Sequence, residues 1–210
     1  VMDGKKTLKE IIVEAPHGVK LVPGASGIQN LAALNKSQTA AIISAFSEIE
    51  SEIDFLVVDM AAGLSDSVMT FLCACQKRYI VVKNEPSSIA DAYATIKVML
   101  QDFNLNNISL IPNGVISQKD GVRLSKNINT VIKNFLGGNV DYLHSITFDE
   151  MILRATKASK CLLDYAPSSN ATRDFKELAK IITSQDSASA LSGGLQFFVE
   201  RMTMNQARVG

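Results

Sequence analysis

The chain lacks the features that mark several specialised classes of protein. No apolar run approaches the roughly 18 residues that a helix needs to cross a bilayer, and no signal peptide is visible at the start. Lysine plus arginine and aspartate plus glutamate each number 21 in 210 residues, so the formal net charge is zero. Without a global basic field, charge alone would not hold nucleic acid on this protein.

Cysteine and histidine are scarce, and their spacing matches no common metal or nucleophile site. Cys73 and Cys75 lie two positions apart, a spacing typical of no usual metal site, and Cys161 is the third cysteine. The apolar surroundings of the first two predict a buried helix with reduced thiols, and hence a cytosolic protein. His17 and His144 belong to no H-E-x-x-H motif and to no arrangement typical of a catalytic triad. We therefore set aside metalloenzyme and triad-hydrolase chemistry.

What the chain does have is an alternation of short apolar runs with amphipathic stretches. Hydrophobic residues make up 47% of the sequence and charged residues 20%, which is typical of a globular chain rather than a disordered one. Consecutive apolar residues indicate parallel strands buried on both faces, and they occur at Val19–Val22, Phe55–Val58, Tyr79–Val82, Ile108–Pro112 and Tyr142–Ile146. Apolar stripes at helical spacing lie at Ile42–Ile49, Ile89–Leu100, Leu124–Phe135 and Phe175–Ile182, with Ser87 and Ser88 as candidate N-caps of the second stripe.

This alternation predicts an α/β fold with a mostly parallel sheet and helices on both faces. In such sheets ligands bind beyond the carboxyl ends of the strands. We expect one domain over residues 1–183 and a linker over residues 184–194, which are rich in serine, alanine and glycine. We expect residues 195–210 to form an amphipathic segment, in which an apolar stripe at helical spacing is made by Leu195, Phe198, Val199 and Met202 and widened by Phe197. Such a stripe suits either a membrane interface or packing on the chain's own domain or on a dimer partner.

The segment Asp54–Gly63 carries the strongest chemical signal. Four consecutive apolar residues, Phe55–Val58, are followed at once by Asp59, and Gly63 comes four positions later. In P-loop NTPases an aspartate at a strand end holds Mg²⁺ or its water, and a glycine lets the backbone approach a phosphate. An ordinary strand whose final aspartate caps the next helix has the same pattern. The spacing alone does not decide between these two interpretations.

Several segments in order resemble MinD/ParA-type P-loop ATPases, and in particular flagellar-number regulators of the FlhG (FleN) type. Asp54–Gly63 is similar to that family's Walker B and switch II segment, D-x-x-φ-x-D-x-x-x-G with φ apolar. Pro16–Gly27, Asn84–Ala94 and Leu195–Arg201 are similar to further segments of FlhG proteins. The resemblance covers nearly the whole chain, and it implies a MinD-like fold that is incomplete at the N-terminus, with Asp59 on Mg²⁺ and Gly63 on the γ-phosphate side.

The resemblance also implies where the base of ATP would bind. Ile108–Gly114 is a predicted strand that ends in Asn113, and an asparagine amide suits a purine edge because it both donates and accepts hydrogen bonds. Asn113-Gly114 is equally a strong turn signal, so a plain turn is the alternative. The loop of Thr147, Phe148 and Asp149 is similar to the family's Pro-x-Asp loop around the adenine. Thr147 stands where proline is usual, which predicts a less rigid loop and weakens the case for backbone contacts to the base.

The family's phosphate loop, K-G-G-x-G-K-[ST], is missing from the sequence. Asp3–Thr7 places lysine before threonine, but no glycine-rich run precedes it, so it predicts a turn and a helix start. Because the chain opens with Val1 in mid-element, we expect an N-terminal truncation that removes the phosphate-loop unit. Asp59 alone cannot position the phosphates, so this fragment by itself is expected to be inactive as an ATP hydrolase.

The function that the resemblance implies is regulation of flagellar number or placement. It includes homodimerisation with ATP and Mg²⁺, peripheral contact of the C-terminal segment with the inner face of the cell membrane, and a cytoplasmic location with the cell pole as one expected place. The implied partners are an FlhF-type GTPase, flagellar switch proteins or a flagellar transcription activator. Two alternatives stay open: a non-catalytic interaction module, and a ParA-type partition ATPase on DNA, which zero net charge makes less favoured.

Overall fold

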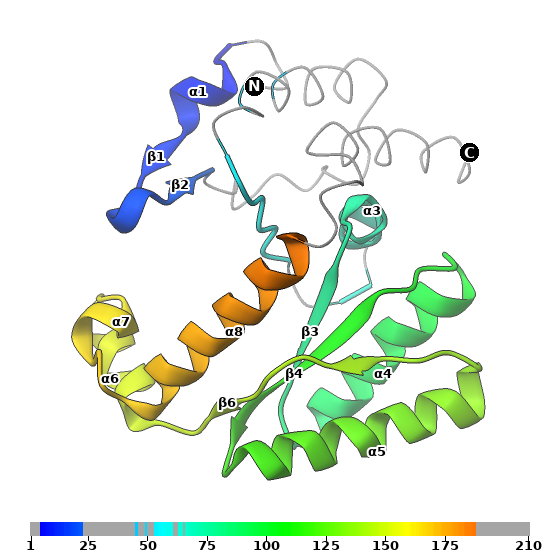
Figure 1. The fold of residues 1–210 in the computed structure, drawn as a ribbon. Coiled ribbons are helices and arrows are strands. Elements are labelled where there is room, and N and C mark those ends of the chain that lie inside the picture. The colour runs from blue at the N-terminus through cyan, green and yellow to red at the C-terminus, as the bar shows by residue number, and fades with distance from the viewer. Residues whose placement is uncertain are drawn as a thin grey trace. The chain divides into compact units, whose positions relative to one another are not determined.

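The computed structural model describes residues 5–22, 45, 49, 53–60, 63–64 and 66–187. Contacts divide the chain into two compact units, one formed by residues 1–75 with 191–210 and the other by residues 76–190. Figure 1 shows the elements of both units. The second unit holds the four-stranded sheet and most of the described helices.

The sheet of the second unit is built around one central strand. β4 (Ile108–Val115) pairs in parallel with β3 (Arg78–Val82) on one side and with β5 (Asp141–Tyr142) and β6 (Ile146–Thr147) along its length. The predicted strands at Tyr79–Val82 and Ile108–Pro112 are therefore confirmed, as is the parallel pairing. A strand buried on both faces needs consecutive apolar residues, and β3 and β4 supply them.

Helices cover both faces of this sheet, as the sequence predicts. α4 (Pro86–Gln101) and α5 (Gln118–Leu136) pack side by side on one face (Figure 1). The other face is covered by α6 (Glu150–Lys157), α7 (Leu162–Tyr165) and α8 (Asn170–Ser187). Side chains alternate along β4, so Leu110 is buried towards the first pair of helices, whereas Ile111 packs with Ala155, Leu162 and Ala171 of the second group.

The helix ends follow local capping chemistry, with one departure from expectation. The Ser117 hydroxyl accepts the Asp120 N–H at the start of α5, and Gly137 ends that helix in the left-handed conformation at φ +66°. Ser87 and Ser88 are not N-caps, because α4 begins at Pro86. The Ser88 hydroxyl instead accepts the Lys83 N–H at 3.0 Å, while proline occupies the first turn, where its missing N–H costs nothing.

The predicted strand at Tyr142–Ile146 is wrong as a single element. The structure splits it into β5 and β6, and the register along β4 shifts between Asn113 and Val115. Pro112 has no N–H to donate to the neighbouring strand. Opposite it, the Ser145 hydroxyl is hydrogen-bonded to the Tyr142 hydroxyl. The interruption therefore arises from the partner strand as much as from the segment itself.

The first unit contains shorter elements. α1 (Leu8–Ile11) begins with a capping box, in which the Thr7 hydroxyl accepts the Glu10 N–H and the Glu10 carboxylate accepts the Thr7 N–H. The prediction of a turn and helix start at Asp3–Thr7 is thus confirmed for its described residues. After α1 come β1 (Val13–Glu14), η1 (Pro16–Gly18), β2 (Lys20–Leu21) and, later, α3 (Asp66–Ala74), in which Cys73 is buried as expected.

Two predicted buried strands of the first unit are wrong. The run Val19–Val22 contributes only β2, which pairs antiparallel with β1 and is exposed. Phe55–Val58 forms no strand, and Val57 is 86% exposed. Within the described ranges no strand pairs with Phe55–Val58, and an apolar run becomes a buried strand only when neighbouring strands and helices cover it.

Some expectations fall partly or wholly outside the described residues. Ile42, Ile43 and Phe46 of the first helical stripe lie there, as does the C-terminal segment 195–210, whereas Ile49 is buried with Leu8 and Ala45. α8 extends to Ser187, so the first residues of the proposed linker 184–194 are helical. Within the described ranges, no helix combines the length and apolar character that a membrane span requires.

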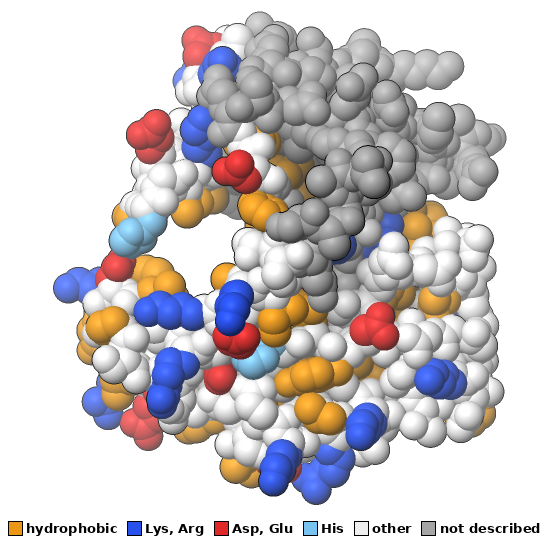
Figure 2. Space-filling model, in the orientation of Figure 1, with side chains coloured by type: hydrophobic (Ala, Val, Ile, Leu, Met, Phe, Trp, Pro, Cys, Tyr) orange, Lys and Arg blue, Asp and Glu red, His pale blue; other side chains and the backbone are white. Residues whose placement is uncertain are grey.

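Figure 2 shows the side chains on one face of the molecule. Over α6 and α7 hydrophobic side chains are mixed with lysine and arginine, and Leu153, Leu163 and Tyr165 are exposed in these helices. On the described part of this face, basic side chains are interspersed with acidic and neutral ones. They form no continuous basic surface there of the kind that holds nucleic acid.

A glycine sets how closely α5 approaches the strand ends. A Cβ on Gly121 would lie 1.9 Å from Ser145 Oγ, 2.8 Å from Ser145 Cβ and 3.3 Å from Pro112 Cβ. Helix propensity alone favours alanine over glycine by about 1 kcal/mol, but the clash outweighs it. We expect Gly121→Ala to lower the free energy of unfolding by about 1–3 kcal/mol in urea titrations followed by circular dichroism. Asn127→Ala, at an exposed position of α5, should leave stability unchanged or slightly raised, and a Gly121→Ala variant as stable as the parent would contradict the close packing.

Candidate functional site

The predicted site residues are divided between the two units. Asp59 and Gly63 belong to the first unit, and Asn113, Thr147, Phe148 and Asp149 belong to the second. Asp59 is exposed in irregular backbone, and its carboxylate has no hydrogen bond or ion pair to any residue that the structure describes. Gly63 has φ +117°, a backbone conformation that residues other than glycine rarely adopt.

The four residues of the second unit meet at the carboxyl end of β4. Asn113 pairs with Ile146 and Val115 with Thr147 in the parallel ladder. The next residue, Phe148, donates its N–H to the Val115 carbonyl at 2.8 Å. The loop that follows β6 therefore lies against the end of β4, at the edge of the sheet where ligands of parallel α/β folds bind.

Asn113 and Gly114 do not form a turn between elements. Both lie inside β4, at the register shift, and Gly114 has φ +71°. A glycine with positive φ is typical of a β-bulge, so the sequence signal for a turn marks a bulge here. Asn113 is half-buried, and its side-chain amide has no hydrogen-bond partner within the part of the chain that the structure describes. That amide can therefore serve a ligand.

Two N–H groups of the loop, those of Thr147 and Phe148, are used by the protein itself. The Thr147 N–H and hydroxyl both donate to Asp174 Oδ2, at 2.9 and 2.5 Å, and the Phe148 N–H is held by β4. The Phe148 side chain is 70% exposed, and Ile116, which follows β4, is 91% exposed. The loop thus presents an exposed aromatic ring, whereas its Thr147 and Phe148 N–H groups are not available to a ligand.

Asp149 has a structural role that the sequence did not predict. Its Oδ1 accepts the Met151 N–H at 2.9 Å as the N-cap of α6, and its Oδ2 accepts the Ala171 N–H at 3.2 Å in the first turn of α8. These hydrogen bonds, with that from Met151 the strongest, hold the pKa of Asp149 below its usual value. One carboxylate thereby joins the starts of two helices.

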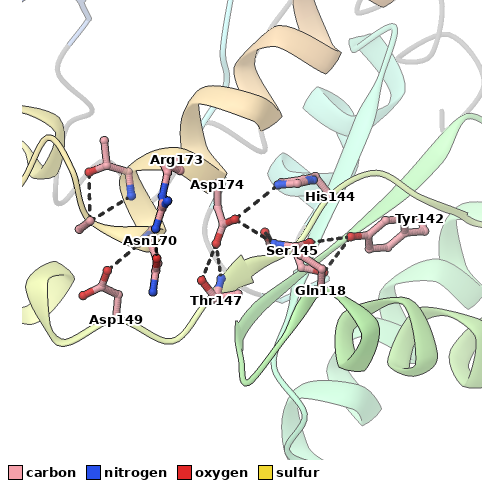
Figure 3. Close-up of polar contacts among 12 residues, drawn as sticks. Gln118, Tyr142, His144, Ser145, Thr147, Asp149, Asn170, Arg173 and Asp174 are labelled. Carbon is pink, nitrogen blue, oxygen red and sulfur yellow. Dashed lines mark hydrogen bonds and ion pairs between the residues drawn. The ribbon is translucent and has the colours of Figure 1, made fainter.

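A polar network beside the loop was not predicted from the sequence. Asp174 of α8 accepts hydrogen bonds from Thr147 and, through Oδ1, from Gln118 Nε2 at 2.9 Å (Figure 3). Gln118 Nε2 also donates to the Ser145 carbonyl, and the Tyr142 hydroxyl donates to Gln118 Oε1. His144 Nε2 lies 3.8 Å from Asp174 Oδ1. Gln118 and Asp174 are 56 positions apart, so no local pattern signals their contact.

Comparison with known proteins places the chain in a family. The antiactivator FleN of Pseudomonas aeruginosa is 36% identical to it over 207 residues, which span 99% of this chain and 74% of the relative. The chain belongs to the FlhG (FleN) family of MinD/ParA-like P-loop ATPases. The flagellum site-determining protein YlxH of Helicobacter pylori is 29% identical over 205 residues, which span 96% of this chain and 69% of that relative. No protein-family profile matches the chain.

Solved structures agree with the fold. The cell division ATPase MinD of Pyrococcus furiosus matches with a TM-score of 0.62 at 19% identity, over 88% of this chain and 73% of that one. MinD of Pyrococcus horikoshii, complexed with Mg-ADP, also matches with a TM-score of 0.62, at 20% identity over 86% and 70% of the two chains. The MinD-like α/β fold predicted for this FlhG-family chain is thereby confirmed.

The depressed pKa of Asp149 predicts a pH-dependent contribution to stability. Because the folded-state pKa lies below the value of about 3.9 for an unfolded aspartate, the contribution is present above that pH and is lost as the pH falls through the folded-state pKa. We expect Asp149→Asn to be less stable than the parent by about 1 kcal/mol at pH 7, since one N–H loses its acceptor. The difference should shrink below about pH 4 in urea titrations at a series of pH values.

The control for this prediction is Asp91→Asn, at an exposed position of α4. It should follow the parent at every pH. A difference between Asp149→Asn and the parent that stays constant from neutral to acid pH would show that the charge of Asp149 does not stabilise the fold.

Proposed function

We propose that this FlhG-family chain binds ATP with Mg²⁺ and regulates flagellar number or placement in the manner of a MinD-like switch. The observation that carries the proposal is similarity to FleN along 99% of the chain, including the segments that hold Asp59, Asn113 and Thr147–Asp149. The relatives' names, an antiactivator and a flagellum site-determining protein, support a flagellar role.

The base site of the second unit supports recognition of a purine. The Asn113 amide has no protein partner among the described residues, and it offers both a donor and an acceptor to a purine edge. Since the Thr147 and Phe148 N–H groups are engaged, the loop contributes the exposed Phe148 ring, on which a base can stack. Asp149 acts indirectly, by fixing α6 and α8 behind the loop.

The Mg²⁺ and phosphate side of the site depends on Asp59 and Gly63. The exposed Asp59 carboxylate is a hard oxygen donor, and Mg²⁺ on a nucleotide usually takes only one or two carboxylates and keeps several waters. Asp59 therefore fits a magnesium ligand, and Gly63, with φ +117°, fits a close backbone approach to phosphate. When bound, Mg²⁺ would neutralise charge that develops on the phosphates. The sequence holds no K-G-G-x-G-K-[ST] loop to position those phosphates.

The 210-residue chain should bind adenine nucleotides weakly and hydrolyse no ATP. In titrations of the ¹⁵N-labelled chain with ADP and Mg²⁺, the Asn113 side-chain and Phe148 amide resonances should shift. Asn113→Ala should weaken the affinity about tenfold, since a buried base edge loses its partner. Phosphate release from ATP should equal that of a blank, because positioning and charge stabilisation of the phosphates supply most of the catalysis.

The matched control is Asn127→Ala, an exposed asparagine of α5, which should bind ADP like the parent. Equal ADP affinity of Asn113→Ala and the parent would remove Asn113 from the base site. Phosphate release clearly above the blank would overturn the prediction of inactivity.

We further propose that the chain dimerises with ATP and acts in the cytoplasm, peripherally at the inner face of the membrane through Leu195, Phe197, Phe198, Val199 and Met202. These residues lie outside the described part of the chain, so their sequence pattern alone supports this role. The proposed partners are an FlhF-type GTPase, flagellar switch proteins or a flagellar transcription activator. Zero net charge and the interspersed charges of Figure 2 disfavour a DNA partner.

The membrane proposal has a direct test. Phe198→Asp places a charge in the apolar stripe, which should reduce co-sedimentation with anionic lipid vesicles at least several-fold relative to the parent, because a buried charge opposes insertion. Arg208→Asp, outside the stripe, is the charge-change control and should keep most of the binding. If parent and Phe198→Asp bind vesicles equally, the stripe does not contact membrane.

A further inference from the structure

We call the loop of Thr147, Phe148 and Asp149 the base loop. The hydrogen bonds beside it have assignable donors and acceptors, and Asp174 is a final acceptor among them. The single Tyr142 hydroxyl proton goes to Gln118 Oε1, so in the 3.1 Å contact between Tyr142 and Ser145 the Ser145 hydroxyl is the donor. Gln118 Nε2 faces two acceptors, the Ser145 carbonyl and Asp174 Oδ1, which fixes the orientation of its amide. Each group donates to the next, and the Asp174 carboxylate receives from both Gln118 and Thr147 (Figure 3).

Asp174 is placed to hold the loop strongly. Its side chain is 15% exposed, so its hydrogen bonds are little screened by solvent. One carboxylate oxygen, Oδ2, takes both donors of Thr147, and hydrogen bonds to an ionised acceptor are roughly twice as strong as neutral ones. Gln118 in turn bridges the other oxygen to the Ser145 carbonyl, two residues before Thr147.

Thr147 alone would leave this loop adaptable. Threonine has no ring to fix its φ angle, and the loop that follows β6 is short and carries the exposed Phe148 ring. With both Thr147 donors on Asp174, the backbone immediately before Phe148 is tied to α8. The Phe148 backbone, whose N–H donates to the Val115 carbonyl, is then fixed beside the end of β4, where Asn113 lies.

We propose that Asp174, oriented by its hydrogen bond from Gln118, is a positioning residue that fixes the base loop. It does so by accepting both the N–H and the hydroxyl of Thr147, an arrangement that we call the clamp. This inference rests on the proposed function for its consequence in nucleotide binding, whereas the clamp itself can be measured without nucleotide. Asp174 touches no base. It acts through Thr147 on the placement of Phe148.

The first arm of the test measures amide hydrogen exchange in the 210-residue chain without nucleotide. Asp174→Ala should speed exchange of the Thr147 amide at least tenfold while the amides of α5 and β3 exchange as in the parent. The control is Glu177→Ala, one turn further along α8, where the exposed side chain lies 3.9 Å from Lys180 Nζ in an ion pair. Unchanged exchange at Thr147 in Asp174→Ala, or equal acceleration across the whole second unit, would overturn the clamp.

The second arm measures ADP affinity in the presence of Mg²⁺. Asp174→Ala should weaken binding about tenfold, and adding Thr147→Pro to it should restore binding to within about threefold of the parent, because proline removes the orphaned N–H and hydroxyl and fixes φ. Loss of binding that Thr147→Pro does not restore would indicate general damage rather than positioning. A parent that fails to bind ADP would overturn the proposed function, and the exchange arm would still decide the clamp.

Discussion

The structure of the second unit depends on the parallel pairing of β4 with the strands on both of its sides. Parallel pairing forces the carboxyl ends of β3, β4 and β6 to the same edge of the sheet, so the residues that follow each strand become neighbours. Asn113 and the loop of Thr147–Asp149 meet for this reason, although Asn113 and Thr147 are 34 positions apart in the sequence. The absence of a side chain at Gly121 completes the arrangement, because it lets α5 approach Ser145 and Pro112 and so brings Gln118 to the loop.

Which groups at this edge of the sheet can bind a ligand depends on which polar groups are already hydrogen-bonded within the protein. The Thr147 and Phe148 N–H groups and the Asp149 carboxylate are satisfied internally, so they stabilise the scaffold rather than a ligand. In the function proposed above, the Asn113 amide and the exposed Phe148 ring are the groups that would recognise and stack a purine. Asp59 and Gly63, the residues proposed for Mg²⁺ and phosphate, belong to the first unit.

Sequence reasoning predicted the elements whose signal is carried by their own residues. The apolar runs of β3 and β4 and the stripes of α4, α5 and α8 match the structure, and the ordered motifs identified the FlhG-type family. It failed where a neighbour decides the outcome. Phe55–Val58 is as apolar as β3 but forms no strand, because no described strand pairs with it, and the run ending at Ile146 is split opposite Pro112.

The candidate site shows the same division. Asn113 and the loop could be placed from motif order, but Asp149 turned out to anchor two helices, and Asp174 and Gln118 were missed entirely. Their partners lie 24 to 56 positions away, so neither spacing nor periodicity can reveal them. Only the packing of α5 and α8 on opposite faces of one sheet edge brings them together.

The most direct test of a purine site at the end of β4 is the intermolecular nuclear Overhauser effect between bound ADP and the labelled chain. Contacts from the adenine protons to the Phe148 ring and the Asn113 side chain are the predicted result, since both groups face the same edge. Bound ADP whose adenine protons contact neither residue, but contact protons elsewhere on the chain, would contradict the assignment of the base site.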